Sequence, residues 1–223
     1  MPRYRCHVVA TALFLAAALT AGAQSNRYQE ETSARNGQPR FDYFVLSLSW
    51  SPDFCATDQD VPECGGVKKF GFVVHGLWPQ RERGYPQHCA GPDFNPADVP
   101  SDLYDIIPSK SLVRHEWQTH GTCSGLAERD YFTLVEHAFE QTTIPTAYRQ
   151  PLQQIEVSPR DIQKNFAKSN PGSSPSAFSV QCSGNRFLKE VRACLTKDLK
   201  PRPCGADIES NCHAETIILR PLR

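Results

Sequence analysis

The feature that most constrains this chain is its set of cysteines. Nine occur, and Cys6 lies in an N-terminal segment that we expect to be removed, so eight remain: Cys55, Cys64, Cys89, Cys123, Cys182, Cys194, Cys204 and Cys212. An even number in an exported chain predicts four disulfides, and counting alone allows roughly a hundred pairings. Because the sequence holds no C-x-x-C pair, zinc ribbons and thioredoxin-like redox sites are disfavoured.

Residues 1–23 have the pattern of a cleavable secretory signal peptide. Arg3 and Arg5 form a basic start, an apolar stretch runs from Val8 to Leu19, and small residues follow at 21–23. The alternative is a membrane anchor, but the stretch is shorter than the ~20 residues that a spanning helix needs. We therefore expect a secreted or periplasmic monomer that makes no membrane contact after cleavage.

The charge balance excludes one class of nucleic-acid-binding protein. The whole chain has 24 Lys and Arg and 24 Asp and Glu, so removal of the two signal arginines leaves 22 against 24, a net charge of −2. Such a chain cannot hold nucleic acid by bulk positive charge. An enzyme that contacts a few phosphates locally stays open.

The pattern of apolar residues predicts one α+β domain at residues 41–223. We expect a central, mostly antiparallel sheet flanked by helices, with four disulfides. Alternating apolar residues or short apolar runs predict strands at 41–50, 70–74, 178–182, 187–195 and 216–219. Apolar residues at helical spacing predict helices at 111–120, 130–141 and 158–169. A flexible polar lead-in is expected at 24–40, and a loop with short helical turns at 79–108.

A first candidate group follows the second expected strand. Residues 72–79 read FVVHGLWP, so His75 ends an apolar run and is followed by a glycine and a tryptophan. A single histidine at a strand end is more often structural than functional, so this group alone identifies no site.

A second group places two histidines and a glutamate within six residues. Residues 115–123 read HEWQTHGTC. Glu116 and His120 are four apart in the expected helix and share a face, and His115 lies about 100° to one side. With His75 approaching from its strand, one imidazole could take a proton while another gives one. Such a pair suits phosphoryl transfer within RNA, where a 2′-OH loses a proton and a 5′-oxygen gains one.

A zinc site is the alternative for the same segment. A zincin helix needs His-Glu-x-x-His, in which the two histidines are one turn apart. Here His115 and His120 are five residues apart, about 140° on an α-helix, which is a poor arrangement for binding one ion. We therefore expect no metal at this site.

At these segments the chain resembles the ribonuclease T(2) family, which comprises secreted, largely base-nonspecific endoribonucleases and includes plant self-incompatibility ribonucleases. The two family signatures occur at 75–79 (HGLWP) and 115–123 (HEWxxHGTC), and Trp50 to Cys55 is similar to a Trp-x-Pro-x-x-Cys block. The resemblance covers Phe41 to the C-terminus in order. It implies an RNA substrate, no action on DNA, and no metal or organic cofactor.

The resemblance also implies a role for each candidate catalytic residue. His120 would be the general base on the 2′-OH, and His75 the general acid for the leaving 5′-oxygen. His115 would bind the phosphate, and Glu116 would help to polarise and orient it. The first product would be a 2′,3′-cyclic phosphate, which is then hydrolysed more slowly to a 3′-phosphate.

Base contacts and disulfide pairs are implied in the same way. Trp78 would be a stacking platform for a base, with core packing as the equal alternative, and Gln80 and Tyr85 are weaker candidates. The implied pairs are Cys55–Cys64, Cys89–Cys123, Cys182–Cys212 and Cys194–Cys204.

One position departs from the family pattern. Thr119 stands where the family usually has a lysine, whose ammonium would stabilise charge on the phosphorane. Thr119 can contribute one neutral hydrogen bond to the substrate, and Arg114 or Arg81 could supply a cation. We expect an active, slower enzyme; the alternative is a weak or inactive member that acts as a secreted binding or toxin-like protein.

Overall fold

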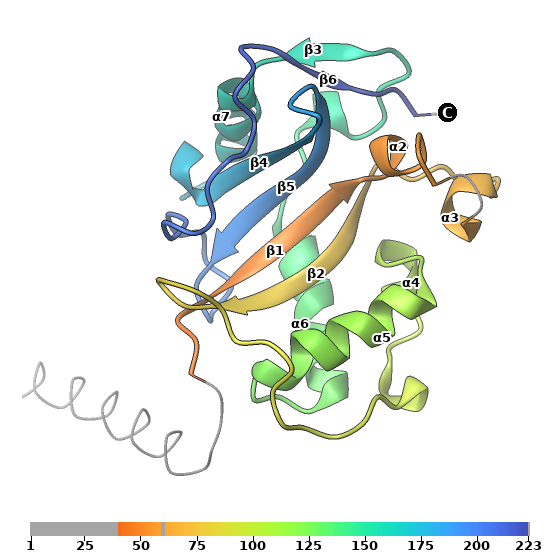
Figure 1. Ribbon diagram of the computed structural model, residues 1–223, viewed down its shortest axis with the longest axis vertical. Coiled ribbons are helices and arrows are strands. Elements are labelled where there is room, and N and C mark those ends of the chain that lie inside the picture. The colour runs from red at the N-terminus through yellow and green to blue at the C-terminus, as the bar shows by residue number, and fades with distance from the viewer. Residues whose placement is uncertain (1–39, 59–60, 223) are drawn as a thin grey trace, which may run out of the picture. The chain divides into compact units, whose positions relative to one another are not determined.

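The computed structural model describes residues 40–58 and 61–222. The expected signal peptide and all of the expected lead-in except Arg40 therefore lie outside the described residues. The strands are β1 (Tyr43–Trp50), β2 (Phe72–Gln80), β3 (Ile155–Val157), β4 (Phe178–Ser183), β5 (Phe187–Leu195) and β6 (Ile217–Leu219). The helices are α2 (Ser51–Phe54), α3 (Pro62–Gly65), α4 (Leu103–Ile106), α5 (Lys110–Thr119), α6 (Glu128–Gln141) and α7 (Pro159–Ser169) (Figure 1).

The strands form one mixed sheet in the order β2-β1-β5-β6-β3, with β4 also paired to β5. The pairings are antiparallel except for β5 with β6, which is parallel and joins one pair of residues. Helix α5 contacts β2, α6 contacts β1 and β2, and α7 contacts β4. In Figure 1, α6 passes behind β1 and β2. The prediction of an α+β fold with a mostly antiparallel central sheet is confirmed.

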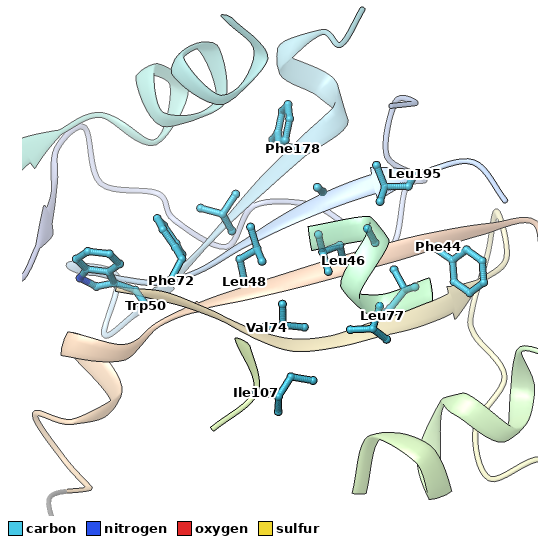
Figure 2. Packing of buried hydrophobic residues seen from close by; sticks show 14 of the residues in the cluster. Phe44, Leu46, Leu48, Trp50, Phe72, Val74, Leu77, Ile107, Phe178 and Leu195 are labelled. Carbon is cyan, nitrogen blue, oxygen red and sulfur yellow. The ribbon is translucent and has the colours of Figure 1, made fainter. Parts of the chain in front are cut away.

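Alternation along the strands gives the sheet two different faces. One face, which we call the helix face, packs against α5, α6 and α7 and carries the large core cluster shown in part in Figure 2, including Leu46, Leu48, Val74 and Leu77. The intervening residues point to the opposite side. We call this opposite side the polar face, defined by Ser47, Ser49, His75, Trp78, Glu190 and Arg192.

Strand β2 is longer than expected. The predicted strand was 70–74, and its predicted end was wrong, because β2 continues through His75 to Gln80. In the register with β1, Ser47 pairs with Gly76 and Leu48 with Val74, so His75 is an extra residue in a β-bulge. A polar residue followed by glycine resembles the end of a strand in sequence, although here it marks a bulge within one.

The other elements agree with their patterns to different degrees. Helix α7 begins after Ser158, whose side chain caps the helix by accepting a hydrogen bond from the Asp161 N–H, and its end at Ser169 is the predicted one. Strand β5 has the predicted bounds, 187–195. The short elements α2, α3 and β3 were not predicted, because three or four residues are too few to show a period.

Four disulfides fix the parts of the domain that carry little regular structure. The pairs are Cys55–Cys64, Cys89–Cys123, Cys182–Cys212 and Cys194–Cys204, the same four that the resemblance implied. The Cys89–Cys123 bridge connects the loop after β2 to the turn after α5. Among residues 40–58 and 61–222, no helix is long and apolar enough to span a membrane.

Candidate active site

The bulge in β2 sets the direction of the His75 side chain. A bulge turns the extra residue out of the regular alternation, and such turns often occur beside active sites. His75 is 36% exposed, and its Nδ1 lies 3.4 Å from Oγ of Ser49 on the neighbouring strand. The ring is therefore held against the polar face while one side of it stays accessible.

Helix α5 supplies the second half of the site. Its N-cap is Ser109, whose hydroxyl accepts a hydrogen bond from the Leu112 N–H. His120 follows the last helical residue, with φ −120° and ψ −44°, and its N–H donates to the Glu116 carbonyl oxygen at 2.9 Å. The helix therefore ends at the histidine, and Glu116 and His120 both reach the edge of β2 where Trp78 lies.

Gly121 directly follows the predicted helix 111–120, a position typical of a C-cap glycine, but the structure shows another role. It begins a 3-10 turn, Gly121–Cys123, and its backbone does not adopt a positive φ. A Cβ at this position would lie 2.4 Å from Cε3 of Trp117 and 2.9 Å from the ring of Tyr131. Close packing, and not a left-handed conformation, explains this glycine.

Glu116 approaches the strand through the space that Gly76 leaves. A Cβ on Gly76 would come within 1.9 Å of Glu116 Oε2, so only glycine admits the carboxylate. The same Oε2 accepts a hydrogen bond of 2.8 Å from Nε1 of Trp78, and Oε1 lies 3.8 Å from Nε2 of His75. Glu116 is 1% exposed, and this burial raises its pKa to about 7, although His75 and Trp78 act in the opposite direction.

The pKa values of His120 and His75, whose rings both lie near Trp78, are shifted in opposite directions. Burial lowers the pKa of His120 to about 4, and the neighbouring histidines at 115, 75 and 88 add to the effect. Burial would also lower the pKa of His75, but contact with Glu190 and the charges of Glu116 and Glu190 outweigh it and raise that pKa. At neutral pH, His120 is therefore neutral and able to accept a proton, whereas the raised pKa of His75 favours its protonated form.

Trp78 lies at the centre of the group. Its ring centroid is 5.4 Å from that of His75 and 5.4 Å from that of His120. The guanidinium of Arg192 lies 5.2 Å from the same ring. Trp78 is partly buried and holds Glu116, so the indole is part of the site's framework. Its role as a stacking platform stays a prediction.

The remaining candidate residues on α5 lie at its surface and beneath it. His115 is exposed, whereas Thr119 is 4% exposed, with its hydroxyl 3.5 Å from His115 Nδ1. Of the two arginines suggested as alternative cations, Arg114 lies over the Phe94 ring at 5.0 Å, and Arg81 donates to the Arg40 carbonyl oxygen. The structure therefore directs both arginines to contacts outside the histidine group.

Two weaker candidates occupy contrasting positions. Gln80, in β2, is buried, and its Oε1 has no hydrogen-bond partner among the described residues. Tyr85 follows β2 in a loop and is exposed. Of the two, only Tyr85 has a side chain that a substrate could reach without rearrangement.

Sequence reasoning missed two residues of β5. In the register of β5 with β1, Glu190 pairs with Ser49 and Arg192 with Ser47. Oε2 of Glu190 lies 3.5 Å from Nδ1 of His75, and Oε1 of Glu190 forms an ion pair with Nε of Arg192. The available signal was the spacing of two between Glu190 and Arg192, which places both side chains on the same face of a predicted strand.

No metal centre is indicated by the side chains that the structure describes. Within residues 40–58 and 61–222, no group of three or more His, Cys, Asp or Glu is arranged to hold a metal ion.

Comparisons with known proteins point to one family. The profile of the Ribonuclease T2 family matches residues 41–204. A ribonuclease of Aeromonas hydrophila is 33% identical over 176 residues, which make up 77% of this chain and 79% of that protein. An RNase-related protein from Calystegia sepium superposes with a TM-score of 0.68 at 20% identity, covering 83% of this chain and 99% of that chain. RNase NT in complex with 5′-AMP gives a TM-score of 0.66 at 25% identity, covering 82% of this chain and 100% of that chain.

Proposed function

The chain belongs to the ribonuclease T2 family of endoribonucleases, and we propose that it cuts single-stranded RNA through two histidines without a metal ion. The observation that carries the proposal is that His75 and His120 both lie 5.4 Å from the Trp78 ring, next to Glu116, with pKa values shifted in opposite directions. Metal-independent cleavage of RNA needs a neutral base and a protonated acid at the same time.

In this mechanism His120 takes the proton of the 2′-OH. The 2′-oxygen then forms a bond to phosphorus, the bond from phosphorus to the 5′-oxygen breaks, and His75 gives its proton to the leaving oxygen. Nδ1 of His120 is buried, so Nε2 is the nitrogen that faces the substrate. The product is a 2′,3′-cyclic phosphate, and water later opens it to a 3′-phosphate with the two histidines in reversed roles.

His115 and Glu116 act on the phosphate itself. His115 is exposed beside the group and can bind a phosphate oxygen when it is protonated. The pKa of Glu116, about 7, lets it be protonated in a large fraction of molecules at neutral pH, so that it can donate a hydrogen bond to a phosphate oxygen. Both interactions strengthen as negative charge develops on the phosphorane.

Base recognition is proposed to be weak. Trp78 and Tyr85 offer aromatic surfaces, and every base has a face that can stack on such a surface. Gln80 is a third candidate for a base contact, although it would have to leave its buried position. We propose low base specificity, no cleavage of DNA, a monomer, and a secreted or periplasmic location without membrane contact.

The decisive experiment is cleavage of single-stranded RNA by the purified mature chain, with and without EDTA, beside DNA of the same sequence. We expect RNA to be cut equally in both conditions, DNA to be spared, and a 2′,3′-cyclic phosphate to appear first. His137→Ala, which changes an exposed histidine of α6 far from the motif in sequence, is the matched control and should retain activity. Loss of activity in EDTA, or cleavage of DNA, would overturn the proposal.

A second candidate function is favoured by Thr119 alone. Without the usual lysine, the chain could be a weak or inactive family member that binds RNA or another partner outside the cell. The cleavage assay, combined with a filter assay for RNA binding, separates the two functions. An inactive member would bind RNA in the filter assay and release no cyclic phosphate.

A further inference from the structure

We propose that Glu190 is a positioning residue for the general acid, and that its carboxylate holds Nδ1 of His75 so that Nε2 faces the substrate. The inference rests on the proposed function, in which His75 protonates the leaving oxygen.

The geometry fixes the His75 ring from both sides. Nδ1 lies 3.5 Å from Oε2 of Glu190 and 3.4 Å from Oγ of Ser49, and these two residues are paired across β5 and β1. Nε2 lies on the other side, 3.8 Å from Oε1 of Glu116. The sheet therefore binds one nitrogen of the ring, and the other is directed toward Glu116 of α5.

The burial of Glu190 indicates that its carboxylate is stabilised by specific charged partners. It is 2% exposed, and a buried carboxylate is costly unless it has charged or hydrogen-bonding partners. Its two charged partners are His75 and Arg192, and Arg192 also lies over Trp78. Burial would raise the pKa of Glu190, but these two partners lower it to about 2, so the carboxylate stays ionised wherever the enzyme works.

Charged and titratable groups from two elements face His75. Helix α5 contributes Glu116 and His120, and strand β5 contributes Glu190 and Arg192. The carboxylates favour the imidazolium, whereas burial and Arg192 oppose it. Removal of the charge of Glu190 and removal of the charge of Arg192 should therefore move the pKa of His75 in opposite directions.

The test is an NMR titration of His75 in the disulfide-bonded chain without substrate, together with the pH dependence of kcat on the dinucleotide UpA. Glu190→Gln should lower the pKa of His75 and move the alkaline limb of kcat to lower pH. It should also reduce kcat about ten- to a hundredfold with KM nearly unchanged, because the acid is misplaced and deprotonated. Arg192→Gln should raise the pKa of His75, and Glu190→Asp should restore part of the Glu190→Gln loss.

A second buried ion pair provides the matched control. Asp53, in the short helix α2 that follows β1, and Arg220, after β6, are 3.0 Å apart; the carboxylate is buried, the arginine is partly buried, and neither contributes to the pKa shift of His75. Asp53→Asn should leave the pKa of His75 and the kcat profile unchanged. The proposal is overturned if Glu190→Gln leaves that pKa unchanged, or if Arg192→Gln moves it in the same direction.

Failure of the proposed function would be distinguishable. In that case the parent chain would not cleave UpA, while the NMR titration would still report whether Glu190 controls His75. If Glu190→Gln does not fold, Arg192→Gln, which should raise the pKa of His75, and Glu190→Asp, whose shorter carboxylate lies further from Nδ1 and should lower it, still decide the question.

Discussion

The two faces of the same strands serve different purposes in this molecule. On the helix face, Leu46, Leu48 and Val191 are fully buried among apolar side chains. On the polar face, the adjacent residues Ser49 and Glu190 both lie close to Nδ1 of His75. Because side chains alternate with a period of two, these strands contribute one set of residues to the main core and the other set to the site. Further along the polar face, Tyr43, Val45 and Cys194 form a second, smaller apolar cluster with Ile208.

The two faces also differ in the free energy of burying their side chains. Burial of apolar side chains on the helix face is favourable, at ~25 cal/mol per Å². At the site the protein buries two carboxylates, Glu190 on the polar face and Glu116 on α5, and must offset their desolvation with partners. Substitutions on the helix face should therefore reduce stability, and those in the site should reduce activity more than stability.

The largest effect is expected for His120→Ala. Loss of the general base should lower kcat/KM about 10²- to 10⁴-fold, which corresponds to ~3–5.5 kcal/mol of activation free energy. The free energy of unfolding should change little, since Nδ1 of His120 makes no hydrogen bond among the described residues. The check is kcat/KM on UpA together with urea unfolding; equal losses of stability and activity would erase the contrast between the faces.

Leu48→Ala tests the helix face. The residue is completely buried, so the truncation should lower the free energy of unfolding by about 2–5 kcal/mol while the folded fraction keeps its kcat. The matched variant is Ser49→Ala, its neighbour on the polar face, which should cost far less stability and should affect catalysis through His75. Urea unfolding of both variants measures the difference. If both cost the same stability, the two faces are not distinct.

Glu116→Gln should reduce activity and increase stability at high pH. The pKa of Glu116 is about 7 in the folded chain, above its ordinary value of 4.5, so the folded state binds more protons between these values. The contribution of this group to stability is therefore present at low pH and is lost as pH rises through 7. Relative to the parent chain, the variant should gain on the order of 1–3 kcal/mol more at pH 8 than at pH 5. A difference in unfolding free energy that is constant with pH would contradict this.

The pH profile of kcat/KM should separate the two histidines. His120 must be neutral, so activity should rise as pH rises through about 4, and should fall tenfold for each unit below it. His75 must be protonated, so activity should fall as pH rises through its raised pKa, above the ordinary value of 6.5. Initial rates from pH 3 to 9 measure both limbs. An acid limb near 6.5 would mean that His120 is not desolvated in solution.

The sequence could predict what is local. Five elements, α5, α7, β4, β5 and β6, were predicted to within one residue at each end, because helical spacing and strand patterns are local signals. The group His115, Glu116 and His120 was found because its members are within six residues of one another on one helix. Their assembly with His75 required the family signatures, since no local pattern joins residue 75 to residue 120.

What the sequence could not predict depends on strand pairing. The bulge at His75 exists only in the register with β1, and it was interpreted as a strand end. Glu190 is 115 positions away from His75 in the chain and reaches it only because β5 and β2 both flank β1. The burial of Thr119 was equally hidden, since its position in the motif indicates a substrate contact.

The smallest effect is expected for Thr119→Lys. A cation aimed at the developing charge acts mostly in the transition state, so kcat should rise more than KM falls, by at most about tenfold or ~1.4 kcal/mol. Two observations limit the gain: Thr119 is 4% exposed beside His115, and Arg192 already brings a positive charge to the polar face. Gln118→Lys, which adds the same charge at an exposed position of α5, is the matched control and should not raise kcat.

Repeating Thr119→Lys in the Arg192→Gln background sharpens the comparison. If Arg192 compensates for the missing lysine across the sheet, the lysine should increase kcat more in that background than in the parent chain. The measurement is kcat on UpA for the two single variants and the double variant, and the deviation from additivity gives the coupling between the positions. An unchanged or lower kcat for Thr119→Lys in both backgrounds, in chains that fold, would show that position 119 does not limit the reaction. The charge on the phosphate would then be stabilised by His115 and Glu116 alone, and Thr119 would belong to the packing beneath α5.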